Sequence, residues 1–400
     1  MKAIVLDGEQ RAALAVTRSL GSHGIHVAVG SERKRCLASA TRNCSESFAY
    51  PSPVDDPDGF RAALLKYIES SGDSVLLPVT DVTLSEVLMH REELPAGTAL
   101  PYDAFEKYSE LSDKANLVRI ARELNVPVPD TLLSTDYENN EILVDKAAEF
   151  GFPLVVKPSF SRIRTEQGWK NAKILYARDP DHLRGILSGE TIRRAPFLIQ
   201  RRVYGPGIGI FLLMKEGEVL AKFAHRRIRE KPPSGGVSVV SESVVFPEEA
   251  GGAALRILEK VRWTGVAMVE FKVDRDTNVA KLMEINARFW GSLQLAVSSG
   301  VDFPYLLYRL ALGEPMDPPG SYVVGMRSRW ELGDLDHLLI RMLKSRSNSN
   351  LPPHLGGRSE ALKEFVSDFF RPSVRNEICR RGDMKPFLHE LKNYFRDLAG

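Results

Sequence analysis

The sequence predicts an α/β domain at the N-terminus, an α+β region dominated by antiparallel strands in the middle, and a helical extension at the C-terminus. Three observations lead to this fold class. Apolar strands alternate with helical patterns over residues 1–112, short strands follow one another between residues 197 and 288, and helical patterns resume beyond Pro315. Alternating strands and helices are typical of a parallel sheet, whereas strands in succession favour antiparallel pairing.

Composition excludes several classes of protein. The chain has 400 residues, enough for two or three domains of ~150 residues each. Its 43% hydrophobic and 26% charged residues exclude a disordered chain, and a net charge of +2 excludes a protein that binds nucleic acid in bulk. Three cysteines without metal-type spacing, no signal peptide and no apolar run of about 18 residues lead us to expect a cytoplasmic protein without a membrane span.

The N-terminal elements follow a β–α–β pattern. Lys2–Leu6 and Ile25–Val29 are apolar strands separated by a helical pattern, Phe60–Ile68 is a further helix, and Val75–Leu77 is a buried strand. Asp81 follows the carboxyl end of that last strand, where open α/β sheets place their ligands. It has two interpretations, a ligand contact or the N-cap of the next helix.

The middle of the chain divides into shorter elements. Ser112-Asp113-Lys114 opens a helix, which sets the first domain boundary, and strands are expected at Phe152–Pro158, Lys173–Tyr176 and Phe197–Val203. Residues 159–170 are polar and are expected to form a loop. A low-complexity SRSNSN stretch interrupts the helical extension. The expected domains are therefore residues 1–112, 113–198, 199–315 and 316–400.

The strongest chemical signal is a pair of strands within residues 265–292. Strand alternation places Met268, Glu270 and Lys272 on one face of the first strand. In the return strand Glu284, Asn286 and Arg288 share a face. If residues 276–278 form the loop, with Asn278 left-handed, Glu270 lies opposite Glu284 and Met268 opposite Asn286. A loop of two residues would put Glu284 on the other face.

Two opposed carboxylates repel each other and need a compensating cation. Glu270, Glu284 and the amide oxygen of Asn286 are hard oxygen donors of the kind that Mg²⁺ prefers, and Mg²⁺ commonly shares its shell with phosphates. Lys272 and Arg288 add positive charge suited to an anionic substrate. The alternative is an ordinary amphipathic hairpin with a solvated polar face.

Other basic residues admit two interpretations as well. Lys114 and Lys157 are either solvated or placed to deliver a point charge to a phosphate. If residues 222–231 form a strand, Lys222 and Arg226 lie on one face, and His225, Arg227 and Arg229 lie on the other. Basic residues therefore occur on both faces. The basic residues of one face could bind a phosphate or a carboxylate, and the Gly-Gly loop that follows could close over a substrate. The alternative is that these basic residues are simply exposed to solvent. His225 is expected to be structural.

Taken together, the segments VVKP, Q-x-x-V, HRRIRE-x-PPSGG, VEFK and EINAR-x-WGS resemble the ATP-grasp superfamily. Within it, the chain is similar to carbamoyl-phosphate-synthetase-like carboxylate–amine ligases over roughly residues 1–315. The resemblance implies a Rossmann-like N-terminal domain and an ATP-grasp fold made of a lid subdomain and an antiparallel-sheet domain. ATP, with Mg²⁺ or Mn²⁺, would bind between the lid and the sheet.

The resemblance also implies roles for individual residues. Lys114 and Lys157 would contact the phosphates of ATP, and Lys272 would lie on the nucleotide side. Arg288 would steady the phosphoryl or acyl-phosphate oxygens. The remaining roles fall to sets of residues: a hinge that reads adenine (Gln200, Arg201, Arg202, Val203), the metal ligands (Glu270, Glu284, Asn286) and the substrate side (Lys222, Arg226, Arg227, Arg229).

Two departures from the family pattern stand out. The segment after VVKP contains a single glycine, Gly168, and has Arg162 and Arg164 in place of a glycine-rich lid loop. The hinge has no acidic residue for the ribose hydroxyls.

The activity that the resemblance implies is amide formation from a small-molecule carboxylate and an amine through an acyl phosphate, in a homodimer. The alternatives are a kinase, an acid–thiol ligase and a catalytically idle ATP-binding scaffold.

Overall fold

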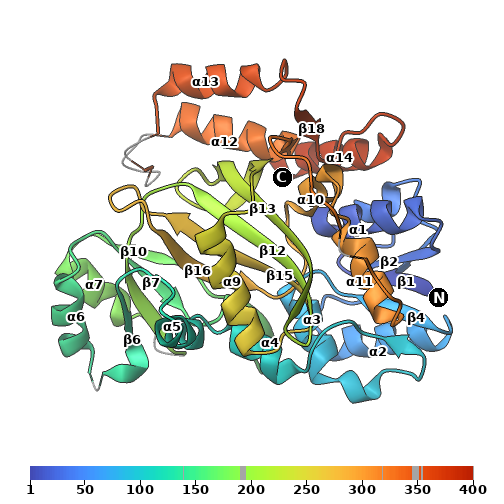
Figure 1. Ribbon diagram of the computed structural model, residues 1–400, viewed down its shortest axis with the longest axis horizontal. Coiled ribbons are helices and arrows are strands. Elements are labelled where there is room, and N and C mark those ends of the chain that lie inside the picture. Colours follow the sequence, from blue (N-terminus) through green and yellow to red (C-terminus); the bar gives the residue numbers. More distant parts are fainter. Residues whose placement is uncertain (138, 190–194, 318, 345–350, 353–354, 400) are drawn as a thin grey trace.

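The computed structural model describes residues 1–400 except 138, 190–194, 318, 345–350, 353–354 and 400 (Figure 1). Its N-terminal sheet has the strand order β3-β2-β1-β4-β5, and all its pairs are parallel, as predicted. The strands are β1 (Lys2–Val5), β2 (Val27–Ser31), β3 (Glu46–Ala49), β4 (Ser74–Leu77) and β5 (Thr98–Ala99). The helices of this region are α1 (Arg11–Ser22), α2 (Pro57–Glu69), α3 (Asp81–Met89) and α4 (Phe105–Ser112).

A second, four-stranded sheet has the order β10-β7-β11-β6. Because strand residues alternate between faces, Ile199 packs with helices α6 and α7, whereas Leu198 packs with α5 on the opposite face. The sheet ends at Arg201, three residues beyond the predicted boundary at 198. Its elements are β6 (Thr131–Leu133), β7 (Leu154–Pro158), β10 (Leu175–Ala177), β11 (Phe197–Arg201), α5 (Lys114–Glu123), α6 (Asn140–Ala148) and α7 (Pro180–Leu187).

The largest sheet has seven strands in the order β16-β15-β12-β13-β14-β17-β18. Buried aromatic residues such as Phe211, Phe223, Phe271 and Trp290 form its core. The pairs from β16 to β17 are antiparallel, as expected for this region. The elements are β12 (Gly207–Lys215), β13 (Glu218–Lys231), β14 (Val237–Ser243), α9 (Glu248–Lys260), β15 (Gly265–Val273), β16 (Ala280–Asn286), α10 (Leu293–Ser299) and α11 (Phe303–Ala311).

The C-terminal extension is helical, as predicted, but it also adds two strands to this sheet. β17 (Arg327–Arg329) pairs with β14, and β18 (Val374–Asn376) pairs with β17 in parallel. Its helices are α12 (Glu331–Leu343), α13 (Arg358–Ser367) and α14 (Lys385–Ala399), which lie at the top of Figure 1. Three-residue strands carry little sequence signal, which explains why they were not predicted. The SRSNSN stretch, residues 345–350, lies outside the described residues.

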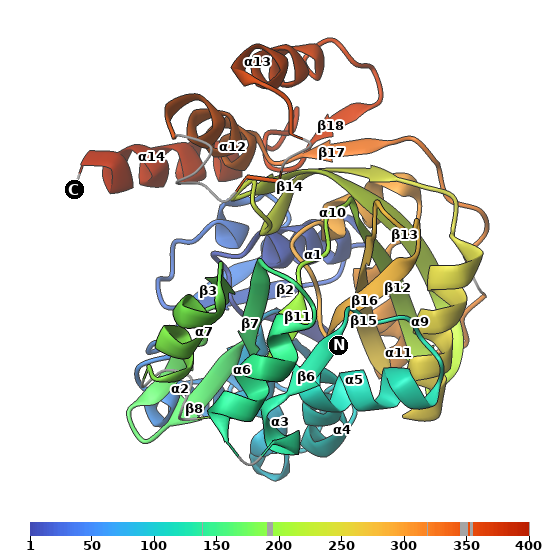
Figure 2. The ribbon, with the colours of Figure 1, turned by 90° about the vertical axis from the view of Figure 1, so that its left-hand side faces the viewer.

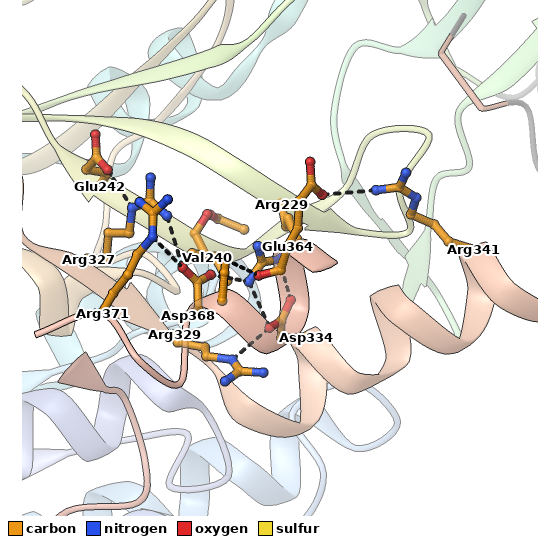
Figure 3. Close-up of polar contacts among 12 residues, drawn as sticks. Arg229, Val240, Glu242, Arg327, Arg329, Asp334, Arg341, Glu364, Asp368 and Arg371 are labelled. Carbon is orange, nitrogen blue, oxygen red and sulfur yellow. Dashed lines mark hydrogen bonds and ion pairs between the residues drawn. The ribbon is translucent and has the colours of Figure 1, made fainter. Parts of the chain in front are cut away.

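Buried ion pairs attach the extension to the sheet (Figure 3). Asp334 of α12 accepts hydrogen bonds from Arg229 of β13, at 2.6 and 3.0 Å, and from Arg329 at 2.7 Å. Asp368 accepts from Arg229 as well and, at 3.0 Å, from Arg327. Asp334 is completely buried. These charges are stable in the interior only because they are paired.

Residues 159–170 were expected to form a loop, and this prediction is wrong. β8 (Arg162–Thr165) and β9 (Gly168–Asn171) pair as a hairpin that contacts the N-terminal domain (Figure 2). The Trp169 indole donates to Glu86 Oε1 at 2.7 Å, and Arg164 lies 3.1 Å from the same oxygen. The backbone N–H of Trp169 donates to the carbonyl of Val54 at 2.8 Å. The hairpin forms because it docks on a surface that is distant in the sequence.

Short 3-10 turns occur at Ala38–Ala40, Arg91–Glu93 and Ser134–Asp136. Within the described part of the chain, no helix combines the length and the apolar character that crossing a membrane requires.

Candidate active site

Most of the predicted site residues surround a cavity of about 370 Å³ between the four-stranded and seven-stranded sheets. Lys114, at the start of α5, lies next to the cavity with its Nζ 3.7 Å from Glu284 Oε2. The structure therefore brings together residues that are as far apart in sequence as Lys114 and Arg288. The cavity wall contains the predicted residues Lys157, Gln200, Arg201, Arg202, Val203, Arg227, Glu270, Lys272, Glu284, Asn286 and Arg288.

Glu270 lies opposite Glu284, and Met268 opposite Asn286, so the predicted pairing is confirmed. Asn278 is left-handed, with φ 55°. The loop is nevertheless longer than expected, because residues 275–278 lie between the hydrogen-bonded pair Asp274 and Val279. A β-bulge between Glu270 and Phe271 then shifts the register by one residue. The longer loop and the bulge cancel, which restores the expected opposition of the two glutamates.

The bulge has a second effect at the site. Phe271 pairs with Leu282, so Met283 is the extra residue of β16. Strict alternation predicts that Met283 points away from the face that carries Glu284, but the structure places Met283 in the cavity wall. No sequence signal distinguishes this bulge from regular alternation.

Burial and nearby charges act differently on the two glutamates. Burial raises the pKa of Glu270, the negative charge of Glu284 raises it further, and Arg227, which donates a hydrogen bond to Glu270, lowers it. Burial also opposes ionisation of Glu284, but Lys114 and Lys157, together with Arg227, outweigh it and lower the pKa of Glu284. At least one carboxylate is therefore ionised at neutral pH. Two opposed carboxylates next to an amide oxygen are a donor set that fits Mg²⁺, with phosphate oxygens completing the shell.

Cationic and hinge residues form the opposite wall. Lys157 is in β7, and burial lowers its pKa to about 8, although Glu284 raises it. A partly desolvated ammonium group of this kind binds anions strongly. Gln200, also buried, donates to Thr131 Oγ1 at 3.0 Å, which fixes the end of β11. The guanidinium of Arg202 lies 4.9 Å from the ring centroid of Tyr176 and is thereby held at the cavity rim.

Arg288 is held in place by a residue of the N-terminal domain. Its Nε and Nη2 donate to the two carboxylate oxygens of Asp81 at 2.6 and 2.8 Å, and Nη2 also donates to Asn286 Oδ1 at 2.9 Å. Burial opposes ionisation of Asp81, but Arg288 outweighs it and lowers the pKa of Asp81. The interpretation of Asp81 as an N-cap is wrong, because Thr80 caps α3. Asp81 instead orients the arginine of the site.

Three of the four basic residues predicted on the substrate side lie elsewhere. Arg226 is exposed and pairs with Glu242 at 2.6 Å, and Lys222 Nζ lies 4.9 Å from the Phe246 ring centroid. Both are on the face of β13 opposite Arg227, as alternation requires. Arg229 was expected on the same face as Arg227, but an irregularity between them directs Arg229 to the C-terminal extension. The structure thus brings Arg227 alone of the four into the wall of this cavity.

One residue of the wall was missed by the sequence analysis. Arg11, at the start of α1, lines the same cavity. Its Nη1 pairs with Glu377 at 2.7 Å, and its Nη2 donates to the carbonyl of Ser238 at 3.4 Å. A Cβ atom at Gly291 would lie 2.9 Å from Arg11 Nη2, so the glycine of the WGS segment leaves room for this arginine. That glycine is the only sequence signal for the contact.

His225 is structural, as expected, and gives the protein a specific acid sensitivity. It is buried between strands, and burial lowers its pKa to about 3. The unfolded chain binds a proton at this site below about pH 6.5, but the folded protein does not, so the free energy of unfolding falls by about 1.4 kcal/mol per pH unit below that value. We expect urea unfolding of the wild type to show this loss between about pH 7 and pH 5, as an excess of about 2 kcal/mol over His225→Leu. Equal losses in both proteins would contradict the assignment.

Comparison with known proteins bears on the fold of the chain. Residues 193–331 match a family model described as ATP-grasp in the biosynthetic pathway with Ter operon. A D-aspartate ligase from Enterococcus faecium (strain Aus0004) is 25% identical over 253 residues, which are 59% of this chain and 58% of that protein. The match therefore spans little more than half of the length of that relative.

Solved structures resemble the chain over a larger share of its length. A biotin carboxylase–β,γ-ATP complex from Campylobacter jejuni has a TM-score of 0.64 at 14% identity and covers 82% of this chain and 74% of its own. An N5-carboxyaminoimidazole synthetase from Staphylococcus aureus has a TM-score of 0.61 at 13% identity, with 82% and 80% covered. At such identities the likeness concerns the fold. The predicted ATP-grasp fold is confirmed.

Proposed function

We propose that this chain, which has the ATP-grasp fold, is an ATP-dependent carboxylate–amine ligase that forms an amide bond through an acyl phosphate. The observation that carries the proposal is that Glu270 and Glu284, neighbours on adjacent strands, both line one cavity, with Lys114 3.7 Å from Glu284 and Lys157 in the opposite wall. This pattern of two carboxylates and two lysines suits a nucleoside triphosphate that binds together with a divalent ion.

In this proposal each residue of the cavity has one task. Lys114, Lys157 and Lys272 bind the phosphates, and residues 200–203 contact the adenine. Glu270, Glu284 and Asn286 hold Mg²⁺ or Mn²⁺, which, when bound, neutralises charge on the transferring phosphoryl group. Arg227 reduces the repulsion between the two glutamates, since it already pairs with Glu270.

The chemistry then needs no side-chain nucleophile. An oxygen of the substrate carboxylate attacks the γ-phosphorus of ATP, the bond to the bridging oxygen breaks, and ADP leaves. A neutral amine attacks the carbonyl carbon of the acyl phosphate, inorganic phosphate leaves, and the amine nitrogen loses a proton. Arg288, held by Asp81 at 2.6 and 2.8 Å, stabilises the oxyanion of the tetrahedral intermediate.

The proposal is tested by screening ADP release against matrices of amino acids, hydroxy acids and amines, with mass spectrometry of the products. An amide product accompanied by ADP and phosphate is the expected result. A phosphorylated acceptor would instead identify a kinase, and a thioester an acid–thiol ligase. Binding of ATP–Mg²⁺ without turnover on any pair of compounds would favour an idle scaffold.

We also propose a cytoplasmic homodimer that takes small-molecule substrates and no nucleic acid. The described cysteines are unpaired, which suits a reducing compartment. A related structure, the biotin carboxylase domain of a Hydrogenobacter thermophilus 2-oxoglutarate carboxylase, is described as a dimer. Light scattering is expected to give twice the chain mass of 44.6 kDa. A mass of one chain would contradict the dimer.

A further inference from the structure

A second cavity, of about 300 Å³, lies beside the nucleotide cavity. The start of α1, the end of β13, and helices α12 and α14 form its walls, and α14 places the C-terminal extension next to the N-terminal domain (Figure 2). Arg11 lines this cavity and the nucleotide cavity alike. The two cavities therefore have one wall residue in common.

Trp330 forms a rigid wall of the second cavity. The guanidinium carbon of Arg11 lies 4.1 Å from its ring centroid, and Lys231 Nζ lies 5.3 Å from it. The indole N–H donates to Glu390 Oε1 at 2.7 Å. The indole thus fixes the carboxylate of Glu390, which comes from α14, at the cavity wall.

The other carboxylates near this cavity each have at least one partner, and Asp397, which also lines it, lies 3.6 Å from Arg396. Asp336 accepts from Lys231 and, at 2.6 Å, from the hydroxyl of Tyr394. Glu9 pairs with His389 at 3.4 Å. Glu331 and Glu377, which lie behind Trp330, accept from the N–H of Cys379 and from Arg11, each at 2.7 Å.

Glu390 lines the cavity itself, whereas Glu377, which also has an unpartnered buried oxygen, does not. Among the described residues none donates to the buried Oε2 of Glu390. Burial, together with the negative charges of Glu331 and Glu377, raises the pKa of Glu390 to about 7, although the hydrogen bond from Trp330 and the charge of Arg11 lower it. Glu390 therefore has an acceptor oxygen without a donor and a negative charge that its neighbours do not fully balance. An ammonium group would supply both the donor and the positive charge.

We propose that this cavity binds the acceptor substrate as a small primary amine, whose ammonium group donates to Glu390 Oε2 beside the Trp330 indole. The assignment rests on the proposed ligase function. An ammonium group fits better than a divalent ion, because the site offers one free carboxylate oxygen and contains Arg11 and Lys231. A volume of about 300 Å³ suits a small ligand. The shared Arg11 places the bound amine next to the cleft in which the acyl phosphate forms.

The test uses calorimetry on the full chain at about pH 8, where Glu390 is mostly ionised and an alkyl amine keeps its proton. The probes are n-butylamine and 1,4-diaminobutane, and n-butanol is the neutral control. We expect both amines to bind the wild type, n-butanol to bind at least tenfold more weakly, and Glu390→Gln to weaken amine binding at least tenfold, by about 1.4 kcal/mol. Lys392→Gln, an exposed position on the same helix, should leave amine binding unchanged.

Three results would overturn the proposal: no binding of either amine to the wild type, equal binding of n-butanol, or unchanged binding by a folded Glu390→Gln. A second measurement needs no variant. A water-soluble carbodiimide should couple 1,4-diaminobutane to Glu390 of the wild type, as read by mass spectrometry, and an unmodified Glu390 would count against the site. The screen for ADP release and amide products tests the ligase function separately, so that failure of the amine site is distinguished from failure of the proposed activity.

Discussion

Replacing Glu284 by alanine is expected to abolish ADP formation, with a loss of at least about 10³-fold in rate. Glu284 interacts with several cations of the site. Lys114 Nζ lies 3.7 Å from its carboxylate, and Lys114, Lys157 and Arg227 together lower its pKa. Its removal leaves Glu270, which already pairs with Arg227, as the remaining carboxylate ligand. The transferring phosphoryl group would then lose its charge neutralisation.

The measurement combines ADP release, on whichever substrate pair the screen identifies, with calorimetry of ATP in the presence and absence of Mg²⁺. We expect the variant to lose the contribution of Mg²⁺ to nucleotide binding, while binding of metal-free ATP persists through the lysines. Glu218→Ala, at an exposed position where β13 begins, is the matched control and should behave as the wild type. Full activity of Glu284→Ala would remove the metal assignment.

The largest effect on stability is expected for Asp334→Ala, at about 3–5 kcal/mol in the free energy of unfolding. Asp334 is completely buried and accepts three hydrogen bonds, two from Arg229 and one from Arg329 (Figure 3). Without it, two guanidinium groups stay in the interior with one negative partner fewer, and Asp368 alone cannot compensate both. Urea unfolding measures the difference.

The same region offers a matched control. Glu364 pairs with Arg341 at 3.3 Å, but its side chain is 44% exposed, so that Glu364→Ala should cost no more than about 1 kcal/mol. A preferential loss of the extension should accompany the Asp334 variant, visible as faster proteolysis after residue 316. Similar destabilisation by both substitutions would show that burial does not govern these pairs.

Local sequence pattern was sufficient to predict the longer elements and the pairing of Glu270 with Glu284, but not the β8–β9 hairpin or the short strands β17 and β18. Period-two alternation and a polar turn placed Glu270 opposite Glu284, because neighbouring strands constrain each other over only a few residues. The loop length was nevertheless wrong, and a bulge made up the difference. Bulges leave the alternation of residue types almost unchanged, so the inward position of Met283 could not be read from the chain.

Contacts between distant segments could not be predicted in the same way. Asp81 and Arg288 are 207 positions apart, and Arg229 and Asp334 are 105 apart. A basic strand such as residues 222–231 shows that cations are present, but an irregularity that alternation does not reveal, and acidic partners distant in sequence, determine where each cation lies. Arg226 and Arg229 are taken up by Glu242 and Asp334, and Arg227 is left to the site.

The hairpin of β8 and β9 is tied to the N-terminal domain through a buried glutamate. Its Trp169 and Arg164 both contact Glu86 of that domain, at 2.7 and 3.1 Å. The hairpin can move away from the domain only if the indole and the guanidinium exchange a buried carboxylate for water. The fluorescence of Trp169 would report this movement, because the indole would then become solvated.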